Sequence, residues 1–339
     1  MNFGYREACL RHDTGRRHPE SPDRIRAIRR ALSDCHGVEY VAADDAEHER
    51  VIAVHDAEYV DAFEQFCSHG GGNWDADTVA SEASWEAALA SAGLAEWAAQ
   101  SALDGDDGRK TPFSLGRPPG HHAVRDDGMG FCFFNNAAVA AQSVIDDGTA
   151  DRVAIFDWDV HHGNGTQDIF YDQGDVFYIS IHEDGLYPDT GRIAETGIGD
   201  AEGTTMNIPF PPGTSGGGYL AAVTELIGPA LSAFNPDLLL VSAGFDAHEH
   251  DPISRMHVPT EGYGRLTEAV REIAADTGAA LGFILEGGYG LDTLSNSVSM
   301  VHEVFDGYQP APAEGEVSDA ARAVLDEVRA ERFEGVPQK

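Results

Sequence analysis

The stretch 153-VAIFDWDVHHGNGTQ-167 runs from an apolar strand directly into two acids, two histidines and a glycine-rich turn. Burying a polar group is costly unless it is hydrogen-bonded, and burying a charge is more costly still. The polar side chains at the end of this strand therefore need either hydrogen bonds to one another or a metal ion. This requirement makes the stretch the starting point for both the fold and the function.

Short apolar runs typical of buried strands alternate along the chain with longer helical patterns. The clearest predicted strands are 153–160, 175–182, 237–245 and 279–288. The predicted helices are 22–32, 57–68, 80–103, 135–147, 217–234 and 260–278, with Thr260 as the expected N-cap of the last. This alternation predicts an α/β fold with a mostly parallel central sheet and helices on both faces.

The domain organisation follows from the absence of any long Pro/Ser-rich linker. We predict a single domain over residues 1–339, with its core in about 1–308 and a C-terminal amphipathic helix at about 318–333, after the segment that begins 309-QPAPAEGE. In such sheets, ligands bind beyond the carboxyl ends of the strands. The polar residues of this chain gather at those ends: Asp157, Asp159 and His161 after the first predicted strand, His182 after the second, Asp246 after the third, and Glu286 and Tyr289 after the fourth.

The charge balance is strongly acidic, with 58 Asp and Glu against 22 Lys and Arg and a formal net charge of −36. A nucleic-acid partner is not expected, because phosphate contacts need a basic face. The composition favours a folded, halophilic protein. At about 1 M salt the Debye length falls to about 3 Å, so the repulsion among the acidic side chains is largely screened. The four cysteines form no C-x-x-C pair, and no secretory signal or membrane span is evident, so a cytoplasmic location is expected.

Asp159 and His161 are two residues apart, and on an extended segment both side chains point to one face. Asp157 shares that face if the strand continues. Asp246, which ends a later apolar strand, is the best candidate for a distant third ligand. Two carboxylates and one imidazole leave an open metal position and suit zinc, and also iron(II), cobalt or manganese. The alternatives are a purely hydrogen-bonded strand end, and His162 as ligand, although strand alternation turns His162 away.

Two further motifs carry reactive groups. The segment 117-RPPGHHA holds His121 and His122 after a rigid turn, and a histidine pair can act as base and acid in hydrolysis. The aromatic, glycine-rich loop 128-GMGFCFFNN follows it. In 285-LEGGY, Tyr289 comes just beyond a strand, where its phenol can donate a hydrogen bond to a developing oxyanion.

Seven motifs in order, HPESPDR, RPPGHHA, GFCFFNN, DWDVHHGNGTQ, SIHEDGLYPDTG, AGFDAH and LEGGY, resemble the zinc-dependent histone deacetylase superfamily. That superfamily also includes acetylpolyamine amidohydrolases and acetoin-utilisation proteins, and Asn164 in the metal turn resembles its class II branch. The resemblance implies Zn²⁺ held by Asp159, His161 and Asp246, with His122 as the main general base and acid.

The same resemblance implies roles for the surrounding residues. Asp157 would fix the tautomer of His121, Asn164 would lie behind His122, and Tyr289 would stabilise the oxyanion. Phe131 and Tyr187 would form the walls of a narrow tunnel for the acyl-lysine stem, and the carbonyl of Gly130 would accept the N–H of the scissile amide. A structural K⁺ would be held by Ser180 and by backbone carbonyls around Asp157, Asp159 and His161.

The reaction implied is hydrolysis of an acetyl amide to acetate and a free amine. Acetyl-lysine in proteins is the first substrate expected, and a small acetylated amine such as an acetylpolyamine is the alternative. The apolar Ile253, where a gatekeeper acid would select polyamines, favours acetyl-lysine. A two-metal ureohydrolase of the arginase type and an inactive acetyl reader are the remaining hypotheses. An arginase-type enzyme would use a D-x-D pattern for its second metal, which the segment GFDAHEHDP around Asp246 lacks. An inactive reader is disfavoured because all the predicted ligands and Tyr289 are present.

Overall fold

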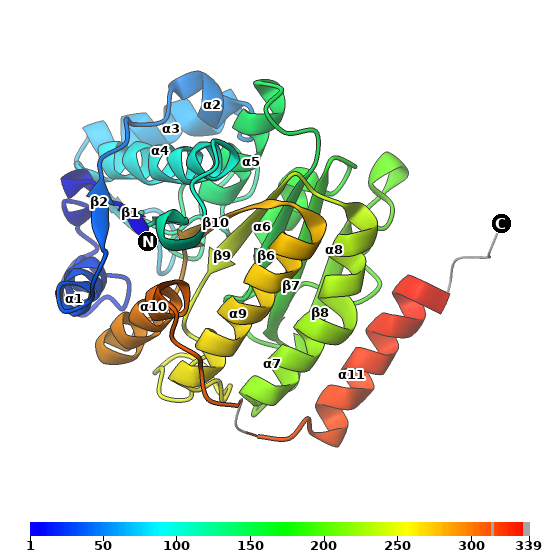
Figure 1. Ribbon diagram of the computed structural model, residues 1–339. Helices are drawn as coiled ribbons and strands as arrows, with labels where there is room; N and C mark the ends of the chain where they lie inside the picture. Colours follow the sequence, from blue (N-terminus) through cyan, green and yellow to red (C-terminus); the bar gives the residue numbers. More distant parts are fainter. Residues whose placement is uncertain (313–314, 335–339) are drawn as a thin grey trace.

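In the computed structural model, which describes residues 1–312 and 315–334, one eight-stranded sheet forms the centre of the molecule (Figure 1). All its strand pairs are parallel, in the order β2-β1-β5-β10-β9-β6-β7-β8. The strands are β1 (Asn2–Gly4), β2 (Glu39–Val41), β5 (Pro112–Ser114), β6 (Val153–Asp157), β7 (Val176–Glu183), β8 (Thr205–Phe210), β9 (Leu238–Ala243) and β10 (Ala280–Leu285). The predicted α/β fold with a parallel sheet is confirmed.

Helices cover both faces of the sheet, as predicted (Figure 1). The helices are α1 (Asp23–Leu32), α2 (His48–Ile52), α3 (Ala57–Ser68), α4 (Ser84–Leu103), α5 (Asn136–Asp146), α6 (Asn164–Phe170), α7 (Gly216–Ala222), α8 (Gly228–Phe234), α9 (Thr260–Thr277), α10 (Leu291–Asp306) and α11 (Asp319–Arg329). Alternate residues of β6 point to opposite faces. Phe156 packs in the core beneath α1, α9 and α10, whereas Ile155 packs in the core beneath α3, α4 and α5. A strand buried on both faces explains the continuous apolar run of the sequence.

The short elements differ from the prediction. Strands β1, β2 and β5 have three residues each, too few to show a periodic pattern, and β8 was also not predicted. The helix predicted from residue 80 begins at Ser84, because Val79–Ser81 forms strand β4, which pairs antiparallel with β3 (Gly71–Asn73). Thr260 is the first residue of α9 rather than its N-cap, and its hydroxyl lies 3.0 Å from His248 Nε2.

The C-terminal helix α11 packs against β8, the strand at one edge of the sheet. Glu225, in a π-helical turn (Val223–Ile227) between α7 and α8, pairs with Arg322 and Arg329 at 2.7 Å each. Part of the preceding segment, residues 313–314, and residues 335–339 lie outside the described part of the chain. None of the described helices combines the length and the hydropathy needed to cross a membrane.

Candidate active site

Four neighbouring strands, β5, β10, β9 and β6, bring the predicted site residues to one edge of the sheet. The tandem histidines follow β5, Tyr289 follows β10, Asp246 follows β9, and the D-x-D-x-H segment follows β6. Because the strands are parallel, their carboxyl ends meet at the same edge. Residues more than 160 positions apart in the sequence therefore surround one site.

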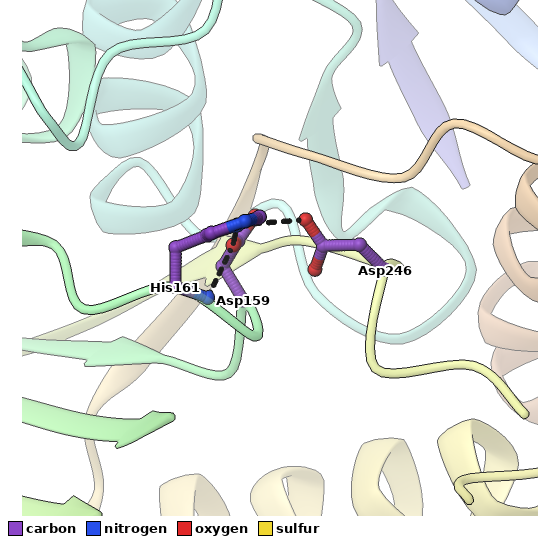
Figure 2. A group of neighbouring side chains, drawn as sticks. All are labelled: Asp159, His161 and Asp246. Carbon is purple, nitrogen blue, oxygen red and sulfur yellow. Dashed lines mark hydrogen bonds and ion pairs between the residues drawn. The ribbon is translucent and has the colours of Figure 1, made fainter. Parts of the chain in front are cut away.

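The side chains of Asp159, His161 and Asp246 form a buried cluster (Figure 2). One potential ligand atom from each lies within 4.8 Å of the other two. His161 Nδ1 is 2.9 Å from Asp159 Oδ1 and 3.2 Å from Asp246 Oδ2. The three predicted metal ligands are thus close enough to share one ion.

The local backbone at the end of β6 explains why these side chains converge. The strand ends at Asp157, so the extended geometry that the sequence predicted through residue 160 is wrong. Instead, the turn is held by its own acids: Asp157 Oδ1 accepts the N–H of Asp159 at 3.1 Å, and Asp159 Oδ1 accepts that of His161 at 2.9 Å. Asp246 Oδ1 accepts the N–H of Val160 at 2.9 Å, which joins β9 to the turn. His162 points away from the cluster and hydrogen-bonds with other side chains, those of Thr190 and Gln167.

The cluster fits a divalent metal ion. Asp246 Oδ2 is buried and makes no hydrogen bond of good geometry with the described residues, its one close polar neighbour being His161 Nδ1 at 3.2 Å, although buried carboxylate oxygens are normally satisfied. A side chain at Gly244 would collide with Asp159, and one at Gly287 would collide with Asp246, so glycine keeps the space around these carboxylates open. Two carboxylates and one imidazole are donors suited to zinc, with one coordination position left for water or substrate.

The electrostatics of the cluster also favour a cation. Burial, together with the nearby carboxylate of Asp159, raises the pKa of Asp246 to about 7. Burial alone would lower the pKa of His161, but its contacts with Asp159 and Asp246 outweigh this effect and raise that pKa to about 10. Two buried carboxylates this close hold protons or a cation between them, because like charges disfavour ionisation of both.

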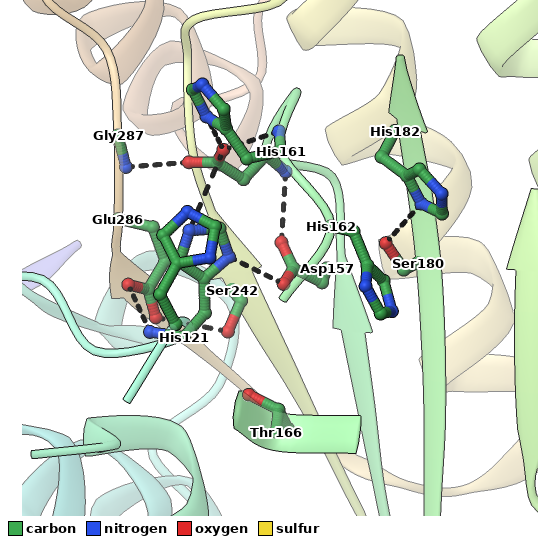
Figure 3. Close-up of polar contacts among 12 residues, drawn as sticks. His121, Asp157, His161, His162, Thr166, Ser180, His182, Ser242, Glu286 and Gly287 are labelled. Carbon is green, nitrogen blue, oxygen red and sulfur yellow. Dashed lines mark hydrogen bonds and ion pairs between the residues drawn. The ribbon is translucent and has the colours of Figure 1, made fainter. Parts of the chain in front are cut away.

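The tandem histidines lie beside the cluster in unlike surroundings, with ring centroids 4.1 Å apart. His121 Nδ1 lies 3.0 Å from Asp157 Oδ2 (Figure 3), and His122 Nδ1 lies 2.8 Å from Asn164 Oδ1. Burial opposes the charge on His121, but the carboxylates of Asp159 and Asp157 raise its pKa to about 10. Burial and the neighbouring histidines lower the pKa of His122 well below its ordinary value. One ring therefore favours the charged form and the other the neutral form.

Two residues support this pair that sequence reasoning did not single out for that purpose. Glu286 Oε2 accepts the backbone N–H group of Gly120 at 2.8 Å. It also accepts that of His121 at 3.2 Å, while Ser242 donates to Oε1 at 3.3 Å (Figure 3). The hydroxyl of Tyr178 donates to Asp157 Oδ2 at 3.2 Å. Glu286 was visible in the sequence as a strand-end acid, but Tyr178 lies inside an apolar run and carried no signal.

Tyr289 stands at the end of the loop that follows β10. Its ring centroid is 5.9 Å from that of Phe131 and 5.2 Å from the Arg24 guanidinium carbon. Burial and the acids of the cluster raise the pKa of Tyr289 well above its ordinary value, so the phenol keeps its proton. Arg24, from the HPESPDR motif, also donates to the carbonyl oxygens of Gly288, at 2.7 Å, and Glu286.

Two of the predicted substrate-binding residues, Gly130 and Tyr187, lie beside His122, and Phe131 lies beside Tyr289. Tyr187 is 39% exposed, and its ring is 5.2 Å from that of His122. Gly130 and Phe131 both have left-handed backbones, with φ of 55° and 71°. A side chain at Gly130 would collide with His122, which explains the glycine. Ile253 lies in the neighbouring loop after Asp246 and is partly exposed.

The predicted potassium residue Ser180 is paired with Asp157 across β6 and β7. Its hydroxyl lies 2.9 Å from Nδ1 of His182, whose Nε2 lies 3.1 Å from the carbonyl oxygen of Gly191. The His182 ring thus lies against His162, with centroids 4.9 Å apart, instead of joining the metal cluster. The strand-end histidine of β7 belongs to this second polar group.

Comparisons with known proteins show which family this chain resembles in sequence and fold. Residues 18–305 match the family model described as the histone deacetylase domain. A histone deacetylase-like amidohydrolase of Pseudomonas aeruginosa is 39% identical over 279 residues, which cover 80% of this chain and 72% of that protein. A probable deacetylase of Archaeoglobus fulgidus is 37% identical over 294 residues, covering 85% and 81% of the two chains. The crystal structure of the HDA15 HD domain has a TM-score of 0.90 and 36% sequence identity, covering 98% of this chain and 96% of that one.

Proposed function

Because the chain belongs to the histone deacetylase family, we propose that it is a zinc-dependent hydrolase that removes acetyl groups from lysine side chains of proteins. The observation that carries the proposal is the convergence of Asp159, His161 and Asp246 on one buried point beside two histidines. Within the described residues this is the one group of three or more such side chains close enough to hold a metal ion, which favours a one-metal amidohydrolase over an arginase-type enzyme.

In this proposal each residue has a defined task. A bound zinc ion supplies Lewis-acid activation of the acetyl carbonyl and of water. His122, neutral and buried, accepts the proton of the attacking water and returns a proton to the leaving amine. Asp157 accepts the Nδ1–H of His121 and orients its ring, and Asn164 orients the ring of His122. Tyr289 keeps its phenolic proton and donates a hydrogen bond to the oxygen that becomes negatively charged.

The substrate is expected to enter between aromatic walls. Phe131 packs against the ring of Tyr289 and Tyr187 against that of His122, and both aromatic rings would contact the methylene stem of an acyl-lysine. The Gly130 carbonyl would accept the N–H of the scissile amide. Ile253 offers no charge to a polyamine. Small acetylated amines are the second candidate, because the relatives include a protein described as an amidohydrolase as well as histone deacetylases.

A side-by-side assay tests the substrate class. The zinc-loaded protein in high-potassium buffer should hydrolyse an acetyl-lysine peptide with a kcat/KM at least about tenfold above that for an acetylpolyamine, because Ile253 gives no ionic contact that would select a cation. The matched variant Ile253→Glu should move the ratio toward the polyamine. A negligible rate on both substrates with zinc bound would contradict the proposed function.

We also propose that the protein works in a potassium-rich, reducing cytoplasm. A structural K⁺ near Ser180 and Asp157 and an acidic surface both suit such a setting. The four cysteines are free, and three of them are buried. Strong net charge repels itself at low ionic strength and is screened at high salt.

Raising KCl from about 0.1 M to about 2 M should therefore raise the thermal unfolding midpoint by on the order of 10 °C. Calorimetry across a KCl series measures the effect, and a NaCl series of equal ionic strength is the control. Equal midpoints in both salts, with higher turnover in KCl, would support a specific potassium site as well. A midpoint that does not rise with salt would contradict the halophilic interpretation.

A further inference from the structure

A buried carboxylate outside the metal cluster holds the loop that carries Tyr289. Asp251 is 7% exposed and accepts three backbone N–H groups. Its Oδ2 accepts those of Tyr289 at 2.7 Å and Gly290 at 3.0 Å. Its Oδ1 accepts that of Ile253 at 3.0 Å, so a single side chain joins the loop that carries Tyr289 to the loop with Ile253.

The loop of residues 287–290, here called the tyrosine loop, needs contacts from outside to fix its backbone, because three of its four residues are glycine. Tyr289 is preceded by Gly287 and Gly288, whose φ is 117°, and followed by Gly290. Glycine restricts the backbone less than any other residue, so these neighbours do not fix the direction of the tyrosine side chain. Arg24 holds the carbonyl of Gly288 on one side of this loop, and Asp251 holds the amide groups on the other.

The position of Asp251 relative to α10 strengthens this anchor. Gly290 is the N-cap residue of α10 and has no side chain to accept the free N–H groups of the first turn. The carboxylate of Asp251 lies at this N-terminus, where the helix dipole favours a negative charge. A carboxylate that accepts several N–H groups fixes their position more firmly than a neutral acceptor does.

We propose that Asp251 is the positioning residue of Tyr289, setting the height of the phenol over the metal cluster and fixing the Ile253 loop in register with it. This inference rests on the proposed function, since it assigns to Asp251 an effect on the step that Tyr289 assists. An error of about 1 Å in the position of a catalytic group can lower turnover by on the order of 100-fold. Asp251 therefore acts on the rate through Tyr289 and does not itself contact the reacting atoms.

The test is a double-mutant cycle with Asp251→Asn and Tyr289→Phe, in which zinc content, kcat and KM are measured for an acetyl-lysine substrate. The amide side chain of asparagine keeps the size of the aspartate but turns an NH₂ group toward at least one of the three N–H groups. Asp251→Asn alone should lower kcat on the order of tenfold to 100-fold, with bound zinc unchanged. In the Tyr289→Phe background the same change should lower kcat by less than about twofold, because residues that act through one another are not additive.

The control is Thr293→Ala, which removes the hydroxyl that donates to the Gly290 carbonyl at 2.8 Å and disturbs the same helix start without touching the N–H of Tyr289. It should leave kcat within about twofold of wild type. An equal loss from Asp251→Asn in both backgrounds, or an equal loss from Thr293→Ala, would overturn the proposal. If Asp251→Asn does not fold with zinc bound, Asp251→Glu replaces it in the cycle, because it keeps the charge but is too long to hold all three N–H groups. A wild-type protein that binds zinc without turnover would instead reject the proposed function.

Discussion

Replacing Asp246 by alanine should empty the metal site and lower turnover by more than about 1,000-fold. Asp246 is one of three side chains in the cluster, and its buried Oδ2 has no other partner among the described residues. Two remaining ligands do not hold a zinc ion against a chelator. Zinc per chain, measured after dialysis against a weak chelator, should fall from about one to below about 0.1.

The matched control is Glu249→Gln, which removes one exposed acid three residues further along the same loop and should leave zinc bound. Asp246→Asn separates loss of the metal from loss of structure, because its side-chain oxygen can still accept the Val160 N–H. Burial and Asp159 raise the pKa of Asp246 to about 7, so its ionised form is disfavoured in the metal-free fold. The metal-free Asn variant should then unfold at a temperature no lower than the metal-free wild type, while added zinc should stabilise only the wild type. Stoichiometric zinc in the alanine variant would show that the ligand assignment is wrong.

The sequence predicted which residues meet at one edge of the sheet, because they lie in short motifs at strand ends. A parallel sheet brings those ends to one edge, so the apolar runs before Asp157, Asp246 and Tyr289 were enough to expect that these residues meet. The predicted backbone geometry that brings Asp159 and His161 together was wrong. Asp159 and His161 converge through a turn that their own carboxylates hold, not through an extended strand.

The residues that the sequence did not reveal act through the backbone or across long distances in the chain. Asp251 accepts backbone N–H groups, and such an acceptor leaves no pattern of spacing; Glu286 was visible as a strand-end acid, but its role as an acceptor of backbone N–H groups was not. Arg24 reaches a carbonyl 264 positions away, which only the folded chain brings near. Tyr178 looked like a core aromatic because its ring is buried in an apolar strand. Local periodicity reports which face is buried, but not what a buried polar atom touches.

Replacing Tyr289 by phenylalanine should lower kcat by about 100-fold to 1,000-fold and leave zinc bound. The change removes one hydroxyl and keeps the ring, so the contacts with Phe131 and Arg24 remain. Removing one donor from an oxyanion site costs this much because the hydrogen bond strengthens as the carbonyl oxygen becomes negative. The measurement is steady-state hydrolysis of an acetyl-lysine peptide, with metal content determined on the same sample.

The two kinetic constants distinguish a catalytic role for Tyr289 from a structural one. A donor that acts only as charge develops contributes to the transition state and little to the ground state, so KM should stay within about twofold of wild type while kcat falls. Tyr187→Phe is the matched control, since it also removes one phenolic hydroxyl beside the histidines but retains the ring that faces His122. It should keep kcat near wild type, because a tunnel wall needs the ring and not the hydroxyl. Unchanged turnover in Tyr289→Phe would remove this residue from the mechanism, whereas a rise in KM alone would assign it to substrate binding.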